Sequence, residues 1–163
     1  MNDRMIKKVS VGIADMKITR QEGILITYAL GSCIGISFYD PMIKLGGLLH
    51  IMLPQKQGTD TNVFKFADSG IPETLRKLQA FGASKSRMVC KIAGGAKMFE
   101  MKGPGGLGNI GDRNAQMVKR VLAAEGLRIR GEDTGANYAR TMLLDVGNGQ
   151  VSIRCAGRPE KFL

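Results

Sequence analysis

Residues 33–53 are C-I-G-I-S-F-Y-D-P-M-I-K-L-G-G-L-L-H-I-M-L, two apolar segments that flank a turn signal. From Cys33 to Tyr39, small and large residues alternate with a period of two, which is typical of a β-strand. Asp40-Pro41 favours a turn, and a second strand is predicted from Lys44 to Leu53. The stretch therefore predicts a β-hairpin, which argues against a purely parallel sheet.

The position of the turn suggests a register for this hairpin. If the strands pair about a turn centred on Pro41-Met42, Tyr39 lies opposite Lys44 and Cys33 lies opposite His50. Directly opposed Cβ atoms are about 4.5–5.5 Å apart on one face of a sheet. The register is a hypothesis, because a shift of one residue would separate the thiol from the imidazole.

Further strands and two helices are predicted around the hairpin. A helix is predicted over Ile71–Phe81, with an earlier start near Ala67-Asp68 and a bend at Pro72 as the alternative. The other predicted elements are strands at Lys8–Ile18, Gly23–Tyr28, Arg87–Ile92, Leu127–Glu132, Tyr138–Val146 and Gln150–Cys155, a surface loop at Gln55–Asn62, a helix at Asp112–Glu125 and a hairpin turn at Gly147-Asn148-Gly149. About eight strands and two helices predict an α+β protein, with a mixed β-sandwich-like core flanked by helices.

Length and composition favour one domain that spans residues 1–163. The chain has no internal repeat, low-complexity stretch or linker. No apolar run approaches the roughly 20 residues of a membrane span, and the first residues lack the apolar region of a signal peptide. We therefore expect a cytoplasmic protein that does not insert into a membrane.

The chain is strongly basic. Lys and Arg number 24 against 14 Asp and Glu, which gives a formal net charge of +10. This balance favours an acidic partner, either nucleic acid or an acidic protein surface. The basic residues are scattered and have no aromatic residues interleaved with them, which argues against nucleic acid. An ordinary solvated basic surface is the alternative.

The cysteine and histidine content limits the possible chemistry. The three cysteines, Cys33, Cys90 and Cys155, form no C-x-x-C pair, which disfavours a disulfide framework. His50 is the only histidine, so a zinc site is disfavoured and we expect no metal or cofactor. Cys90 and Cys155 lie within strand patterns and are interpreted as structural.

Cys33 and His50 together would suit nucleophilic catalysis. A thiolate is a nucleophile, and a neighbouring imidazolium lowers the pKa of a thiol from its ordinary value near ~8.5. Backbone N–H groups at Gly31-Ser32 could hold an oxyanion. A third group normally orients the imidazole, and Thr27, Ser32 and Asp40 are the candidates. The alternative is a buried structural cysteine and a core histidine.

A glycine-rich segment follows the strand predicted at Arg87–Ile92. Its Gly94-Gly95 pair lacks the spacing of nucleotide-binding loops, so we interpret it as a tight loop beside the candidate site. Met98 and Phe99 are candidates for a patch that docks a partner or substrate, with core packing as the alternative.

Several motifs occur in a fixed order along the chain. They are T-Y-A-L-G-S-C at 27–33, Y-D-P at 39–41, G-G-L-L-H-I-M-L-P at 46–54, K-I-A-G-G-A at 91–96, N-I-G-D-R-N at 109–114 and E-D-T-G at 132–135. In these motifs the sequence resembles the CheD family of chemoreceptor glutamine deamidases, along nearly its whole length. The chain departs from the family pattern at Ala29 and at Ala136, where glycine is expected. These two positions test whether the backbone there needs a positive φ angle.

The resemblance implies a cysteine-hydrolase fold similar to the catalytic domains of deamidating toxins. It also implies a Cys–His–Thr triad, at Cys33, His50 and Thr27, that converts glutamines of methyl-accepting chemotaxis receptors to glutamate through a thioester. The CheC phosphatase, which binds and inhibits the deamidase in that family, is the implied partner, and the basic surface would suit an acidic helical receptor. Rival hypotheses are a non-catalytic module that binds receptor or CheC, an RNA-binding domain, and a methylesterase or transglutaminase.

Overall fold

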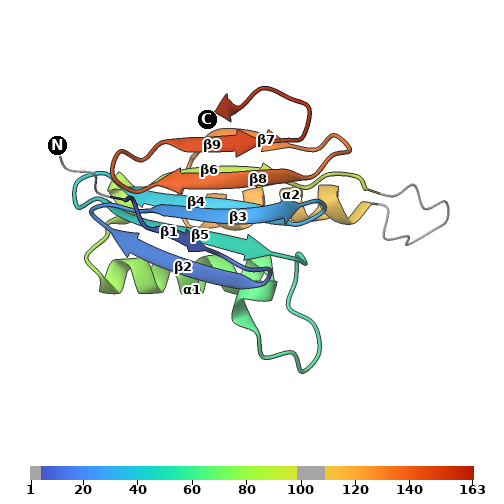
Figure 1. Ribbon diagram of the computed structural model, residues 1–163. Helices are drawn as coiled ribbons and strands as arrows, with labels where there is room; N and C mark the ends of the chain where they lie inside the picture. Colours follow the sequence, from blue (N-terminus) through green and yellow to red (C-terminus); the bar gives the residue numbers. More distant parts are fainter. Residues whose placement is uncertain (1–4, 99–108) are drawn as a thin grey trace.

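The computed structural model describes residues 5–98 and 109–163 and contains two five-stranded sheets and two α-helices. The strands of both sheets lie roughly along one common axis (Figure 1). This architecture confirms the predicted α+β class.

One sheet, which we call the outer sheet, has the order β1-β3-β8-β9-β10. Its first pair, β1 with β3, is parallel, and its other pairs are antiparallel. Its strands are β1 (Lys8–Ser10), β3 (Ile24–Leu30), β8 (Arg140–Asp145), β9 (Val151–Arg154) and β10 (Lys161–Phe162). The two-residue strand β10 was not predicted, because its pattern is too short to recognise without its neighbour β9.

The other sheet, the central sheet, has the order β2-β5-β4-β6-β7. Here β6 and β7 are parallel and the remaining pairs are antiparallel. Its strands are β2 (Asp15–Arg20), β5 (Leu45–Ile51), β4 (Ile34–Asp40), β6 (Val89–Gly94) and β7 (Ile129–Thr134). All residues of β4 and β5 are buried, because this sheet is covered on both faces.

The helices α1 (Ala67–Ala80) and α2 (Ile110–Ala124) cover one face of the central sheet. Two short 3₁₀-helices, η1 (Val63–Lys65) and η2 (Lys85–Arg87), adjoin α1 and β6. Side chains such as Ile36, Leu75 and Val118 fill this helix-side core. On the other face, Leu48, Leu25 and Met142 belong to the core between the two sheets.

Two predicted elements differ from the structure by more than two residues. The single strand predicted at Lys8–Ile18 is wrong, because the chain passes there from β1 in the outer sheet to β2 in the central sheet. Ala14, in the turn between them, has φ +58°. The first helix begins at Ala67, which confirms the earlier start considered from the sequence, and Pro72 lies inside it.

The predicted hairpin is confirmed, but its predicted register is wrong by two residues. Asp40 pairs with Leu45, and Gly35, not Cys33, pairs with His50. The turn contains four residues rather than two, since the Asp40 carboxylate accepts a hydrogen bond from the Met42 amide at 3.1 Å. A shift of two residues preserves the face of each side chain, so Cys33 becomes a diagonal neighbour of His50 on the same face.

Candidate active site

Strand alternation directs His50 toward the outer sheet. Side chains of a strand alternate between the faces of its sheet. In β5, Leu48 lies in the core between the sheets, and His50 is two residues further along on the same face. A side chain at Gly35 of β4 would meet Met142 of β8, and Cys33, just before β4, packs against the same core between the sheets.

Thr27 approaches the same layer from the outer sheet. It is fully buried in β3, two residues after Leu25, which belongs to the core between the sheets. Its Oγ1 lies 2.7 Å from Nδ1 of His50. The structure therefore brings Thr27 and His50 into contact, although they belong to different sheets.

The hydrogen bonds of Thr27 assign the tautomer of His50. A threonine hydroxyl has one hydrogen to donate. Thr27 Oγ1 donates it to the backbone carbonyl of Val11 at 2.8 Å. His50 Nδ1 must then carry a hydrogen and donate it to Thr27, which leaves a lone pair on Nε2. Nε2 is buried and makes no hydrogen bond within the described part of the chain, so it is available to accept a proton.

Burial controls the charges of the two reactive groups. Desolvation lowers the pKa of His50 to about 4. Desolvation also raises the pKa of the Cys33 thiol, an effect partly offset by the residue's own backbone N–H. Both groups are therefore neutral near pH 7, and the imidazolium that the sequence argument placed beside the thiol is not the resting state.

A loop that follows β6 fixes the backbone around Cys33. The Gly95 amide donates to the Cys33 carbonyl at 2.9 Å, and the Ala96 amide donates to the Gly31 carbonyl at 2.8 Å. At Gly94, with φ +113°, a Cβ atom would lie only 2.1 Å from the Cys33 carbonyl oxygen. This confirms the interpretation of the glycine pair as a tight loop beside the site.

The turn before Cys33 contains two amides without a backbone acceptor among the described residues. The amides of Ser32 and Cys33 donate to no backbone carbonyl of the described residues. The Gly31 amide, in contrast, bonds the Ala29 carbonyl at 2.9 Å. Of the predicted oxyanion groups, Ser32 therefore fits the role, and Gly31 contributes the close-packed turn.

Asn114 is a residue of the site that the sequence argument did not single out. It is fully buried on α2, and its Nδ2 donates to the carbonyls of Ser32 at 2.9 Å and Met52 at 2.8 Å. These bonds tie the segment just before β4 to the segment just after β5. The signal in the sequence was a polar residue one helical turn before Val118, on an otherwise apolar face.

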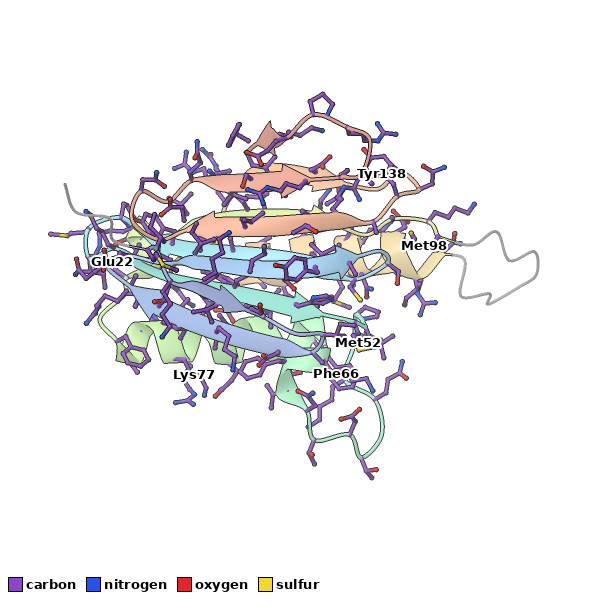
Figure 2. The ribbon with its side chains drawn as sticks, in the orientation of Figure 1. Glu22, Met52, Phe66, Lys77, Met98 and Tyr138 are labelled. Carbon is purple, nitrogen blue, oxygen red and sulfur yellow. The ribbon has the colours of Figure 1, made fainter. Side chains whose placement is uncertain are left out.

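The remaining candidates lie in different places. Met98 is 43% exposed, and a side chain at Gly31 would meet its Cγ at 3.1 Å, so Met98 covers the turn before Cys33. Met98 and Met52 lie at one end of the strands, and Glu22 lies at the other (Figure 2). Asp40 binds Arg87 at the opposite end of β4 and so cannot orient His50. Phe99 lies outside the described residues.

The described residues contain neither a metal-binding cluster nor a helix that could span a membrane. No group of three or more His, Cys, Asp or Glu side chains in that part is arranged to hold a metal ion. None of its helices combines the length and apolar character that a membrane crossing requires.

Comparison with known proteins gives one consistent family. The family model described as CheD chemotactic sensory transduction matches residues 52–155. A relative from Desulforamulus reducens, named probable chemoreceptor glutamine deamidase CheD, is 46% identical across 96% of this chain and 95% of the relative. Relatives with the same name are 47% identical in Moorella thermoacetica, across 96% of each chain, and 42% identical in Syntrophomonas wolfei, across 98% of this chain and 100% of the relative.

Proposed function

The chain belongs to the CheD family, and we propose that it is a chemoreceptor glutamine deamidase with Cys33 as nucleophile, His50 as the acid–base residue and Thr27 as the residue that orients His50. The observation that carries this proposal is the buried series from the Val11 carbonyl through Thr27 to His50. It leaves Nε2 of the imidazole as the free acceptor in the layer that Cys33 faces.

The first half of the reaction forms a thioester. As the Cys33 sulfur attacks the carboxamide carbon of a receptor glutamine, its proton passes to Nε2 of His50. The amides of Ser32 and Cys33 donate to the oxyanion that develops. The C–N bond then breaks, the imidazolium gives its proton to the departing nitrogen, and ammonia leaves. A pKa of about 4 makes the His50 imidazolium a ready proton donor at this step.

The second half regenerates the enzyme. Water attacks the thioester carbon while Nε2 takes one of its protons, and the C–S bond breaks. The proton returns to the sulfur of Cys33, and the substrate side chain leaves as glutamate. Throughout, Thr27 accepts the hydrogen of Nδ1 and so keeps Nε2 directed at the reacting atoms. These steps use side chains and backbone amides of this chain and one water molecule.

The wider setting follows from the same proposal. We propose a single catalytic domain over residues 1–163, with a cysteine-hydrolase fold similar to that of deamidating toxins, which acts in the cytoplasm on methyl-accepting chemotaxis receptors. We also propose that the CheC phosphatase binds and inhibits it. The resemblance of the motifs at 27–33 and 46–54 to the CheD family supports these statements. Addition of CheC should lower the deamidation rate.

The test is ammonia release from the cytoplasmic fragment of a chemoreceptor. The wild-type protein should release ammonia, and Cys33→Ala should release none while it still binds the fragment. Binding without ammonia release by the wild-type protein would contradict the proposal and favour a non-catalytic docking module.

A further inference from the structure

A basic pocket lies beside the candidate active site. It has a volume of about 170 Å³ and is lined by Pro54, Gln55, Arg113, Gln116, Met117 and Arg120. Four of these residues come from one face of α2, and the other two come from the segment that follows β5. We call this surface the α2 pocket.

The α2 pocket adjoins the structure that holds Cys33. Arg113 immediately precedes Asn114, whose amide bonds the carbonyls of Ser32 and Met52. Pro54 follows Met52 by two residues on the segment that leaves β5. Asn114 thus links the helix that carries the α2 pocket to the backbone beside Cys33.

The two arginines of the pocket have no acidic partner among the described residues. Both Arg113 and Arg120 are exposed, and neither forms an ion pair with any described residue. The neighbouring acid, Asp112, accepts a hydrogen bond from Gln116 at 2.9 Å. Elsewhere, Arg87 binds Asp40 and Arg140 binds Asp133. The α2 pocket therefore presents two guanidinium groups without acidic partners in the described structure.

The spacing of the arginines defines what they can bind. They are seven residues apart, which is two turns of the helix and about 10.5 Å along its axis. Residues seven apart on an α-helix lie on the same face. Two carboxylates seven residues apart on another helix have the same separation, and a guanidinium can bind a carboxylate through two hydrogen bonds.

We propose that the α2 pocket binds the carboxylates of an acidic helical segment in the substrate protein, next to the glutamine that enters the site. Arg113 and Arg120 would each bind one carboxylate, and Met117 would supply apolar contact between them. The formal charge of +10 on the whole chain would favour the encounter. This inference rests on the proposed deamidase function, whose substrate it describes in more detail.

The test compares two double variants that remove the same charge. Arg113→Gln/Arg120→Gln alters the α2 pocket, whereas Arg128→Gln/Arg130→Gln alters exposed arginines beyond the far end of α2. With the receptor fragment as substrate, the pocket variant should raise KM about tenfold at unchanged kcat. The control variant should change KM less than about twofold. Alkylation of Cys33 by iodoacetamide should be equal in all three proteins, as expected for an intact site.

A second arm changes the substrate instead. Replacing the carboxylates next to the target glutamine by glutamine should raise KM of the wild-type enzyme by a similar factor. The pocket variant should then show little further loss, because the two changes remove the same contacts. An equal rise in KM in both double variants would show that only net charge matters, and it would overturn the proposal. An unchanged KM in the pocket variant would overturn it as well.

Binding separates this inference from the deamidase proposal. In a Cys33→Ala background, the dissociation constant for the receptor fragment should rise about tenfold in the pocket variant and little in the control. If the wild-type protein binds the fragment without releasing ammonia, the proposed function fails, yet this difference in binding would still support the α2 pocket. Equal dissociation constants for the pocket variant, the control variant and the Cys33→Ala protein itself would overturn the inference. A complete lack of binding would do the same.

Discussion

Thr27 makes two hydrogen bonds with a single hydroxyl hydrogen, and this fixes the proton on His50 at Nδ1. In the proposed mechanism the imidazole therefore acts through Nε2, the nitrogen without a partner among the described residues. Thr27 is the positioning residue of that mechanism, and this role depends on the hydroxyl rather than on its β-branched shape.

Thr27→Val and Thr27→Ser separate these two properties. Valine keeps the shape but leaves the Val11 carbonyl and Nδ1 of His50 unpaired, so kcat should fall about a hundredfold. Serine keeps the hydroxyl, and its kcat should stay within a few-fold of the wild type. Ammonia release from the receptor fragment measures both. Equal rates for Thr27→Val and the wild type would refute the positioning role.

The reactivity of Cys33 should follow its raised pKa. Because burial raises the pKa of the thiol and keeps His50 neutral, the thiolate fraction at pH 7 should be smaller than that of a free cysteine. Alkylation by iodoacetamide, followed at the Cys33 peptide by mass spectrometry, should rise about tenfold per pH unit from pH 6 to 8. A plateau of high reactivity near pH 6 would instead reveal a preformed thiolate–imidazolium pair.

Two alanines carry backbone strain at positions where the sequence departs from the family pattern. Ala29 has φ +57° and Ala136 has φ +58°, so both positions do require the left-handed conformation. The cost for alanine there is about 1–2 kcal/mol. Ala29 lies in an irregular part of β3, four residues before Cys33, and the Ala136 carbonyl accepts from the Lys97 amide at 2.8 Å.

At the scale of elements, the β4–β5 hairpin could be predicted and its register could not. The alternating pattern and the Asp40-Pro41 turn signal are local. The four-residue turn depends on Asp40, whose other carboxylate oxygen accepts from the Ser84 amide at 3.0 Å and from Arg87. Those partners lie more than 40 residues away in sequence, and a local pattern contains no information about them.

The candidate site was predictable only in part. His50 was a candidate as the single histidine, and Cys33 was a candidate because it follows a glycine turn and because the predicted hairpin register placed it opposite His50. The contact between Thr27 and His50 crosses from the outer sheet to the central sheet, and residue spacing alone left Ser32 and Asp40 as competitors. Only the resemblance favoured Thr27. Asn114 was missed because its partners are the backbone carbonyls of Ser32 and Met52, which are distant in sequence.

The loop after β6 offers a test of how closely it must approach Cys33. Gly94 has a positive φ, and a Cβ atom there would strike the Cys33 carbonyl. Gly157 also has a positive φ, +73°, but open space around it. Gly157→Ala should cost about 1 kcal/mol and preserve kcat. Gly94→Ala should move the Cys33 peptide and lower kcat at least a hundredfold. Circular dichroism and ammonia release distinguish the two variants, and full activity of Gly94→Ala would contradict this account of the loop.

At the scale of the whole molecule, one buried histidine makes stability depend on pH. The pKa of His50 is about 4 in the folded protein and near 6.5 when exposed. Between these values the unfolded chain binds more protons than the folded one, so stability falls as pH decreases from 6.5 to 4. At about 1.4 kcal/mol per pKa unit, the loss over this window is roughly 3 kcal/mol.

Urea unfolding of the wild type and His50→Gln at pH 7 and pH 4.5 measures this effect. Most of this loss in the free energy of unfolding should appear in the wild type between pH 7 and pH 4.5, and it should be absent from His50→Gln. Titration of Asp40 does not account for a loss of stability in this pH range. Burial alone would raise its pKa, but hydrogen bonds from Arg87, Ser84 and Met42 hold that pKa below 3.8, outside the window. An equal loss in His50→Gln would show that the histidine is not the group responsible.

The central claim is that Cys33 and His50 together convert receptor glutamines to glutamate. Its most direct test is peptide mass spectrometry of a chemoreceptor cytoplasmic fragment after incubation with the wild-type protein, with Cys33→Ala and with His50→Ala. The account predicts conversion of particular glutamines by the wild type and by neither variant. Conversion of the same glutamines by Cys33→Ala would contradict it.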